Sequence, residues 1–213
     1  MQQAVTPLVT PIEVQTPWMD RLDAAVDDHW GAIFRGHPHI DRAFYLASEL
    51  GDFSLIWHIL NTAQGLRTDE RDADATIRMA VVMLLESLVV NQGVKRLFRR
   101  PRPVSLTPRP HKLRTPSTTS FPSGHATSAF TAAGLLSDRD PKMAPLYYGL
   151  AAVVATSRVH VKIHHATDVL AGAAVGIVFA KVAVKLWKLP PRHQAPAVEA
   201  AAAIQDRRAH EDN

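Results

Sequence analysis

The chain has 213 residues, 46% of them hydrophobic and 21% charged, which fits one globular domain with terminal extensions. It contains no cysteine, which excludes disulfides, thiolate metal sites and a cysteine nucleophile. The net charge is +4, but no acidic residue lies between Glu86 and Asp138, and eight lysines and arginines fall within 95–114. This basic segment predicts an anionic partner: nucleic acid, lipid head groups or a phosphate substrate.

Residues 1–16 are rich in Pro, Thr and Gln and are predicted to be disordered. They lack a basic region followed by an apolar run, so we predict no cleavable signal peptide. In the next segment, 17–34, Trp18, Leu22, Val26 and Trp30 recur at helical spacing. This pattern predicts an amphipathic helix that either packs on a core or lies on a membrane surface.

Five further helices are predicted from apolar runs, at 43–66, 77–94, 123–136, 144–159 and 168–187. The last fits a membrane span best because it has about 20 mostly apolar residues. It contains Gly172-x-x-x-Gly176, which permits close helix packing, and lysines near its end that can reach the membrane interface. The predicted fold is an all-α helical bundle, favoured as an integral membrane protein with about five spans plus the N-terminal helix. A soluble bundle with buried helices is the alternative.

The basic tail after Trp187 favours a cytoplasmic C-terminus. Five spans threaded back from this tail place the segments 95–122 and 158–167 together on the outer side of the membrane. The basic loop then lies on the side that the charge rule disfavours, which we interpret as a functional requirement. The predicted domain is 17–190, followed by a flexible tail at 191–213.

The first motif is Lys95, six residues, then Arg102 and Pro103. Lysine supplies a compact charge and arginine a planar fork of donors, which together suit a tetrahedral oxyanion. A juxtamembrane patch that binds acidic lipid is the alternative for these residues.

The second motif is Phe-Pro-Ser-Gly-His at 121–125, between a polar loop and a predicted helix. Ser123 and Gly124 thus stand at a helix start, where free backbone N–H groups favour an anion and glycine permits close approach. His125 in the first turn can exchange a proton near neutral pH. A serine cap beside an incidental histidine is the alternative.

The third motif, SRVHVKIHHATD at 157–168, contains three histidines. Asp168 lies four residues after His164 and three after His165, so on a helix either ring can meet the carboxylate. A carboxylate on one ring nitrogen leaves the other nitrogen free to attack. Arg158 offers another fork for phosphate. The alternative is a helix capped by Asp168 with surface or interface histidines, and His160 fits that description best.

Together these motifs predict a phosphate cradle formed by Lys95, Arg102, Arg158 and the backbone at Ser123 and Gly124. One histidine is the nucleophile, and another protonates the leaving oxygen. Positioning and electrostatics of this kind supply most of the catalysis in phosphoryl transfer.

The order and spacing of the motifs resemble K-x6-R-P, P-S-G-H and S-R-x5-H-x3-D, the signature of the type-2 phosphatidic acid phosphatase and vanadium haloperoxidase superfamily, over about 75 residues. The resemblance assigns the nucleophile to His164, oriented by Asp168, which leaves His125 as the acid. It implies a helical fold, a covalent phosphohistidine and no metal or other cofactor. Vanadate is then expected as an inhibitor, and as a cofactor only in a haloperoxidase.

We therefore predict a membrane lipid-phosphate phosphatase whose active site faces outward, with lipid phosphate and membrane as partners and no nucleic acid. Phosphatidic acid, phosphatidylglycerol phosphate, polyprenyl pyrophosphate and polyprenyl-phosphoryl sugar phosphates all fit as substrates. The alternatives are a soluble acid phosphatase or vanadate-dependent haloperoxidase with the same cradle, and a non-catalytic binder of acidic lipids. The intact histidine pair argues against the last.

Overall fold

The structure is a computed structural model that describes residues 12–13, 16–66, 70–104, 113–114 and 116–190. Its helices are α1 (Pro17–Phe34), α2 (Pro38–Leu50), α3 (Leu55–Gly65), α4 (Glu70–Leu88), α5 (Lys95–Leu97), α6 (Gly124–Arg139), α7 (Ala144–His160) and α8 (Ala166–Leu186). A π-helical segment, Val89–Val94, joins α4 to α5, and 3-10 turns at Asp52–Ser54 and Pro141–Met143 precede α3 and α7. The two-residue strands β1 (Ile12–Glu13) and β2 (Phe98–Arg99) pair in parallel.

The predicted all-α fold is confirmed, and the predicted amphipathic helix at 17–34 is α1. The segment predicted as one interrupted helix at 43–66 forms two helices, because the chain turns sharply at Phe53 and Ser54. Helix α4 begins at Glu70 rather than at 77. Its first turns carry charges that hydropathy assigns to a loop, but Asp72 and Arg78 are buried in ion pairs with Arg139 and Asp138.

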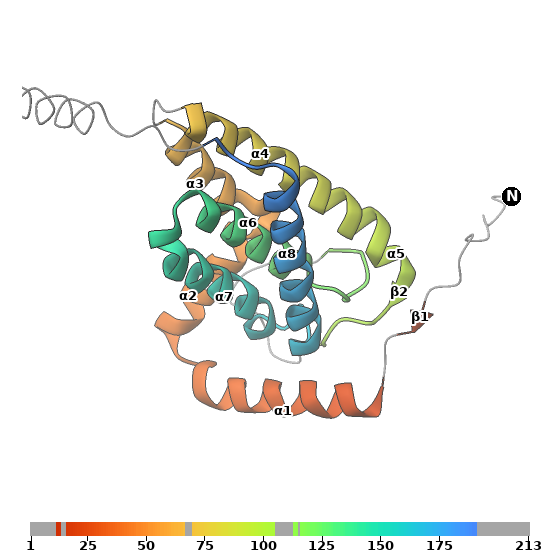
Figure 1. The fold of residues 1–213 in the computed structure, drawn as a ribbon. Helices are drawn as coiled ribbons and strands as arrows, with labels where there is room; N and C mark the ends of the chain where they lie inside the picture. The colour runs from red at the N-terminus through yellow and green to blue at the C-terminus, as the bar shows by residue number, and fades with distance from the viewer. Residues whose placement is uncertain (1–11, 14–15, 67–69, 105–112, 115, 191–213) are drawn as a thin grey trace, which may run out of the picture.

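Helix α6 lies at the centre of the bundle and packs against α4, α7 and α8 (Figure 1). Small side chains on α6, among them Ala129, Ala132 and Ala133, let these neighbours approach closely, and all three are fully buried. Trp57 of α3 and Met79 of α4 fill the space beside them in the same core. The core therefore surrounds the helix that begins at the second motif.

Helix α8 contacts α6 through two glycines. A Cβ added at Gly172 would lie 2.4 Å from the carbonyl oxygen of Ser123, and one added at Gly176 would lie 2.3 Å from that of Thr127. No larger residue fits at these distances without moving a backbone. The predicted close packing at these glycines is confirmed, and it brings the start of α8 beside the start of α6.

The loops predicted to share one side of the molecule lie at the same end of the bundle. Arg102 donates a hydrogen bond to the carbonyl oxygen of Ile163 at 3.0 Å, which joins the first loop to the third motif. Helix α1 crosses this end, near the start of α8 (Figure 1). The ion pairs of Asp72 and Asp138 lie at the opposite end, where α4 begins and α6 ends.

Helix α8 is the one described helix that is long and apolar enough to cross a membrane, with a mean hydropathy of 2.0 in its most apolar stretch. Helices α6 and α7 have 16 and 17 residues, and α4 has 19 but carries several charges. The predicted number of about five spans therefore stays a prediction. Large apolar side chains are nevertheless exposed on α4 and α8, among them Leu84, Leu88, Leu170 and Val178.

The N-terminal segment 1–16 and the tail 191–213, predicted to be disordered and flexible, lie almost entirely outside the described residues. Within the first, Ile12–Glu13 pair with β2.

The close contact of α8 with α6 predicts opposite effects of two glycine substitutions. Gly176→Ala should lower the free energy of unfolding by about 1–3 kcal/mol, the usual cost of overpacking. Gly149 of α7 is exposed and has nothing near its Cβ position, so Gly149→Ala should leave stability unchanged or raise it by up to about 1 kcal/mol. Thermal unfolding in detergent measures both, and equal effects of the two would contradict the packing described.

Candidate active site

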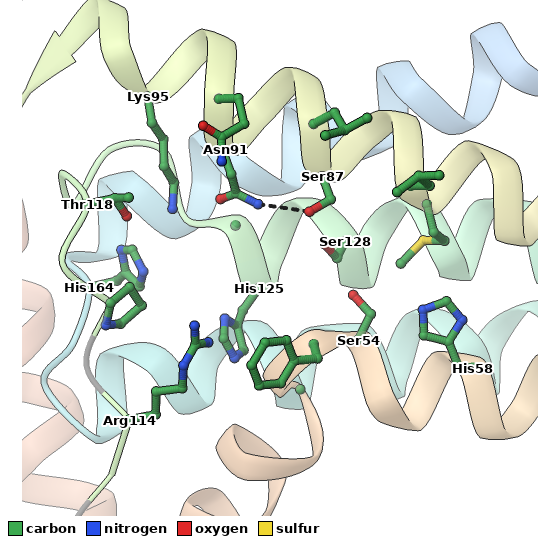
Figure 2. A pocket seen from close by; sticks show the side chains of 18 of the residues that line it. Ser54, His58, Ser87, Asn91, Lys95, Arg114, Thr118, His125, Ser128 and His164 are labelled. Atoms are coloured by element: carbon green, nitrogen blue, oxygen red, sulfur yellow. Dashed lines mark hydrogen bonds between the residues drawn. The ribbon is translucent and has the colours of Figure 1, made fainter.

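A cavity of about 530 Å³ lies between α3 and α4 at the end of the bundle where the three motifs meet. Lys95, His125 and His164 lie at one end of it and His58 at the other (Figure 2). Gly124 also lines it, so four of the eight residues predicted for the site face this space. The other four lie directly behind them: Arg102, Ser123, Arg158 and Asp168.

The side chain of His164 is almost fully buried, and each of its two ring nitrogens has a different neighbour. Nε2 lies 3.1 Å from Nη1 of Arg102, and Nδ1 lies 3.5 Å from Oδ2 of Asp168. A guanidinium only donates, so Nε2 accepts this hydrogen bond and the ring proton sits on Nδ1, toward the carboxylate. The lone pair needed for nucleophilic attack is therefore on Nε2.

Burial, together with the positive charges of Arg102 and Arg158, lowers the pKa of His164 to about 3, against the opposing effect of Asp168. The imidazole is consequently neutral at physiological pH, as a nucleophile must be.

The helical spacing argument for the pair of His164 and Asp168 is wrong, although the two side chains do lie together. Helix α8 begins at Ala166, so His164 precedes it and does not share a helical face with Asp168. The carboxylate instead folds back over the helix start, where its Oδ2 accepts a hydrogen bond from the backbone N–H of His165 at 2.9 Å. This cap brings the Asp168 carboxylate beside the ring of His164, the residue before the cap.

Asp168 is fully buried, and its carboxylate has partners that the sequence analysis missed. Ser120 donates to its Oδ2 at 2.5 Å, and Nη1 of Arg100 donates to its Oδ1 at 2.6 Å. The other nitrogen of Arg100, Nη2, is paired with Asp23 of α1, which also accepts the backbone N–H of Thr167 at 2.8 Å. Arg100 stood in the basic segment and Ser120 in a polar loop, but no local spacing singles out either residue.

The helix start at the second motif differs from the predicted anion site in one respect. The backbone N–H of Ser123 donates to the carbonyl oxygen of Asp168 at 3.0 Å, so it is not free to bind a phosphate. The Ser123 side chain caps α6 by accepting from the N–H of Ala126. The backbone of Gly124 lies beside Lys95, since a Cβ there would lie 3.4 Å from Nζ of that lysine, and its part in anion binding stays a prediction.

Three cations converge behind and beside the cavity. Arg102 is fixed by hydrogen bonds to the carbonyl oxygens of Ile163, Thr118 and Thr119. Arg158 is buried, and its Nη1 donates to Ser48 of α2. Burial, reinforced by Arg102, lowers the pKa of the Lys95 ammonium to about 8, although Glu86 opposes the shift.

The other two histidines of the third motif have partners outside the cavity lining. His160 is buried between α1 and α2, where Nδ1 accepts from the Trp30 indole at 3.1 Å and Nε2 lies 2.9 Å from Asp41. Its predicted place at an interface is confirmed. Nε2 of His165 lies 3.3 Å from the carbonyl oxygen of Pro101. Among the described residues no three His, Asp or Glu side chains cluster as a metal site would require.

The family model of the PAP2 superfamily matches residues 75–190, which contain all three motifs. The chain belongs to the PAP2 superfamily. Together with curated relatives that are named as phosphatases, this membership identifies the chain as a phosphatase that hydrolyses a phosphate ester, and the superfamily resemblance noted from the motifs is confirmed.

Curated relatives of this PAP2 protein include the decaprenylphosphoryl-5-phosphoribose phosphatase of Mycobacterium tuberculosis (strain H37Rv). The two are 34% identical over 146 residues, which cover 64% of this chain and 77% of the relative. A protein of the same name from Mycolicibacterium smegmatis is 33% identical over 141 residues, covering 66% of this chain and 76% of the relative.

Two solved structures share the fold of this PAP2 protein. The transmembrane PAP2-type phosphatidylglycerolphosphate phosphatase of Bacillus subtilis superposes with a TM-score of 0.63 at 23% identity, covering 81% of this chain and 88% of that chain. LpxE of Aquifex aeolicus gives a TM-score of 0.63 at 24% identity, covering 83% and 99%.

The lowered pKa of Lys95 predicts the alkaline side of the pH profile. Its ammonium is charged below about pH 8 and loses its proton as the pH rises through that value, so kcat/KM should fall above about pH 8. In Lys95→Arg the guanidinium stays charged, and the decline should move to higher pH whatever the maximal rate. Initial rates across the alkaline range measure this. A decline at the same pH in both proteins would assign it to another group.

Proposed function

We propose that this PAP2 protein is a lipid-phosphate phosphatase that acts through a covalent phosphohistidine on His164. The observation that carries the proposal is the placement of a neutral, buried imidazole between Asp168 and Arg102, at the charged end of a cavity. In the first step the phosphate takes over the hydrogen bond that Arg102 makes to Nε2, which exposes the lone pair to phosphorus. Lys95, Arg102, Arg158 and the start of α6 balance the charge on the phosphoryl oxygens.

The bond changes balance in two steps. The Nε2–P bond of His164 forms as the P–O bond to the alcohol breaks, and its electron pair leaves with the oxygen, which takes a proton from His125. In the second step His125 removes a proton from water as the water oxygen attacks phosphorus. The electron pair of the N–P bond then returns to His164. Asp168 stabilises the ring throughout by accepting from Nδ1. No metal takes part in either step.

The shape of the cavity supports a lipid substrate. Beyond the cradle, its wall on α4 continues over the apolar side chains of Ala80, Met83, Leu84 and Leu88. Between these two regions lie the polar side chains of Ser54, Ser87, Asn91 and Ser128. A phosphate, then a polar group, then a hydrocarbon chain would fit in that order. Because curated relatives are named for a decaprenylphosphoryl phosphoribose, we propose a polyprenyl-phosphoryl sugar phosphate as the first substrate to test.

We further propose that the protein lies in a membrane, with the active-site end outside and the C-terminus in the cytoplasm. Support comes from the apolar length of α8, from the leucines exposed on α4, and from the placement of both motif-bearing loops at one end of the bundle. The positive charges at the end of α8 favour a cytoplasmic location for that end.

Trapping of labelled phosphate on the protein tests the nucleophile. With a rapidly quenched polyprenyl-phosphoryl sugar phosphate, the wild-type chain should carry an acid-labile phosphohistidine, in the presence of EDTA as well as without it. His164→Ala should abolish both the adduct and turnover, whereas the matched variants His165→Ala and His160→Ala should keep both. Asp168→Asn should bind substrate but form the adduct slower by orders of magnitude, about 10⁴-fold by analogy with other oriented histidines. Label on His165 in the His164→Ala protein would identify a different nucleophile.

Single cysteines test the orientation, since the chain has none of its own. Ser117 is exposed in the loop before the second motif, and Lys188 is exposed just beyond α8. In intact cells a membrane-impermeant maleimide should label Ser117→Cys, and it should label Lys188→Cys only after the membrane is permeabilised. The reverse pattern would invert the orientation, and equal labelling of both in intact cells would contradict a span formed by α8.

A further inference from the structure

His125 has a carboxylate partner that belongs to none of the three motifs. Oδ1 of Asp52 lies 3.0 Å from Nε2 of His125, at ion-pair distance but without the alignment of a hydrogen bond. The aspartate opens the 3-10 turn between α2 and α3, and the histidine stands in the first turn of α6. Both side chains are mostly shielded, with 20% and 12% of their surface exposed, and His125 lines the cavity.

The backbone around Asp52 has an unusual conformation, and it lies very close to the ring of His125. A Cβ added at Gly51 would lie 2.7 Å from Cδ2 of His125, so only glycine permits this approach. Phe53 and Ser54 have φ values of 52° and 59°, in the left-handed region that residues with side chains seldom adopt. Two such residues in succession persist only where tertiary contacts impose them, and they are typical of functional sites.

The charges near His125 explain why a carboxylate beside it matters for its protonation. Burial of the ring, Arg158 of α7 and Lys95 of α5 all disfavour a positive charge on His125. Arg114 lies over the Phe53 ring at 4.3 Å and adds another positive charge beside Asp52. A histidine that must carry a proton toward a leaving group among these cations needs a neighbouring anion, and Asp52 supplies it.

We infer that Asp52 is a positioning residue for His125 and forms with it a second carboxylate–histidine pair, alongside Asp168 and His164. The inference rests on the proposed role of His125 as the acid. Asp52 lies at ion-pair distance from the protonated Nε2 in both steps, which orients the ring and leaves Nδ1 as the atom that exchanges protons with the substrate. When the P–O bond breaks, the Nδ1 proton moves to the leaving oxygen. The lone pair left on Nδ1 then takes a proton from water as the phosphohistidine is hydrolysed.

The same fold contains a matched control. Asp41 of α2 and His160 at the end of α7 form a hydrogen-bonded carboxylate–histidine contact of 2.9 Å, but neither residue lines the cavity. If Asp52 had only a structural part, removing it would resemble removing Asp41: all substrates would be slowed alike. If Asp52 positions the acid, the rate lost when Asp52 is replaced should depend on how much the leaving group needs a proton.

The experiment compares Asp52→Asn, Asp41→Asn, His125→Ala and the double variant Asp52→Asn/His125→Ala as full-length chains in detergent. Each is assayed with an alkyl phosphate, whose leaving group is poor, and with a nitrophenyl phosphate, whose leaving group departs without a proton. Asp52→Asn should lower kcat about 10- to 100-fold on the alkyl phosphate and much less on the aryl phosphate. In the double variant the loss should equal that of His125→Ala alone, because Asp52 acts through His125. Asp52→Glu should restore part of the alkyl phosphatase rate.

The outcomes separate this inference from the proposed function. A loss in His125→Ala that is equal for both leaving groups would overturn the acid role itself. Suppose instead that His125→Ala loses activity mainly on the alkyl phosphate while Asp52→Asn loses activity equally on both substrates. That result would overturn only the role given to Asp52, and so would rate losses that add in the double variant. Thermal unfolding of Asp52→Asn and Asp41→Asn, measured in parallel, shows whether either variant has lost its fold.

Discussion

The arrangement of the site depends on the hydrogen bonds that the buried carboxylate of Asp168 accepts. Asp168 accepts hydrogen bonds from Arg100 of the first motif segment, from Ser120 just before the second motif and from the backbone N–H of His165 in the third. Its own carbonyl oxygen accepts the N–H of Ser123. Segments far apart in the chain are therefore joined at one residue. Each hydrogen bond to an ionised carboxylate in a site closed to water is stronger than a neutral one.

Burying this charge is costly unless it is fully paired, and the pairing extends outward to α1. Arg100 lies between Asp168 and Asp23, and Asp23 also accepts from the backbone N–H and the hydroxyl of Thr167. The amphipathic N-terminal helix thus contributes a carboxylate, Asp23, to the network that supports Asp168. Its apolar residues Trp18, Leu22 and Ile33 remain exposed on the outside. The helix therefore does more than cover the bundle, since the charge balance of the site includes it.

The cavity combines two kinds of surface that a lipid phosphate requires. Fixed cations and two histidines occupy one end, and the side chains of α4 provide an apolar wall toward the other. The two carboxylates behind the histidines differ in their surroundings. Asp168 is fully buried and held by several donors, whereas Asp52 is partly exposed on a turn with left-handed residues. That difference suits the proposed roles, in which His164 stays in place as the nucleophile and His125 exchanges protons with substrate and water.

The sequence by itself determined the helical class, the bounds of α1, most of α6 to α8, and the close packing at Gly172 and Gly176. These follow from local periodicity and from residue size, which act over neighbouring positions. The family resemblance also favoured His164 over His160 as the proposed nucleophile. The Trp30 and Asp41 partners of His160 place that residue at an interface.

Only the tertiary structure decided which polar groups meet. The N–H of Ser123 is occupied by Asp168, and the cap at His165, rather than helical spacing, brings Asp168 beside His164. No local pattern marked Arg100 within its basic segment, or Asp52, as part of the site. Such contacts join residues that are distant in the chain. They depend on how α3 and α8 pack against α6 and how α1 packs against α7 and α8, and a pattern of single residues does not contain that information.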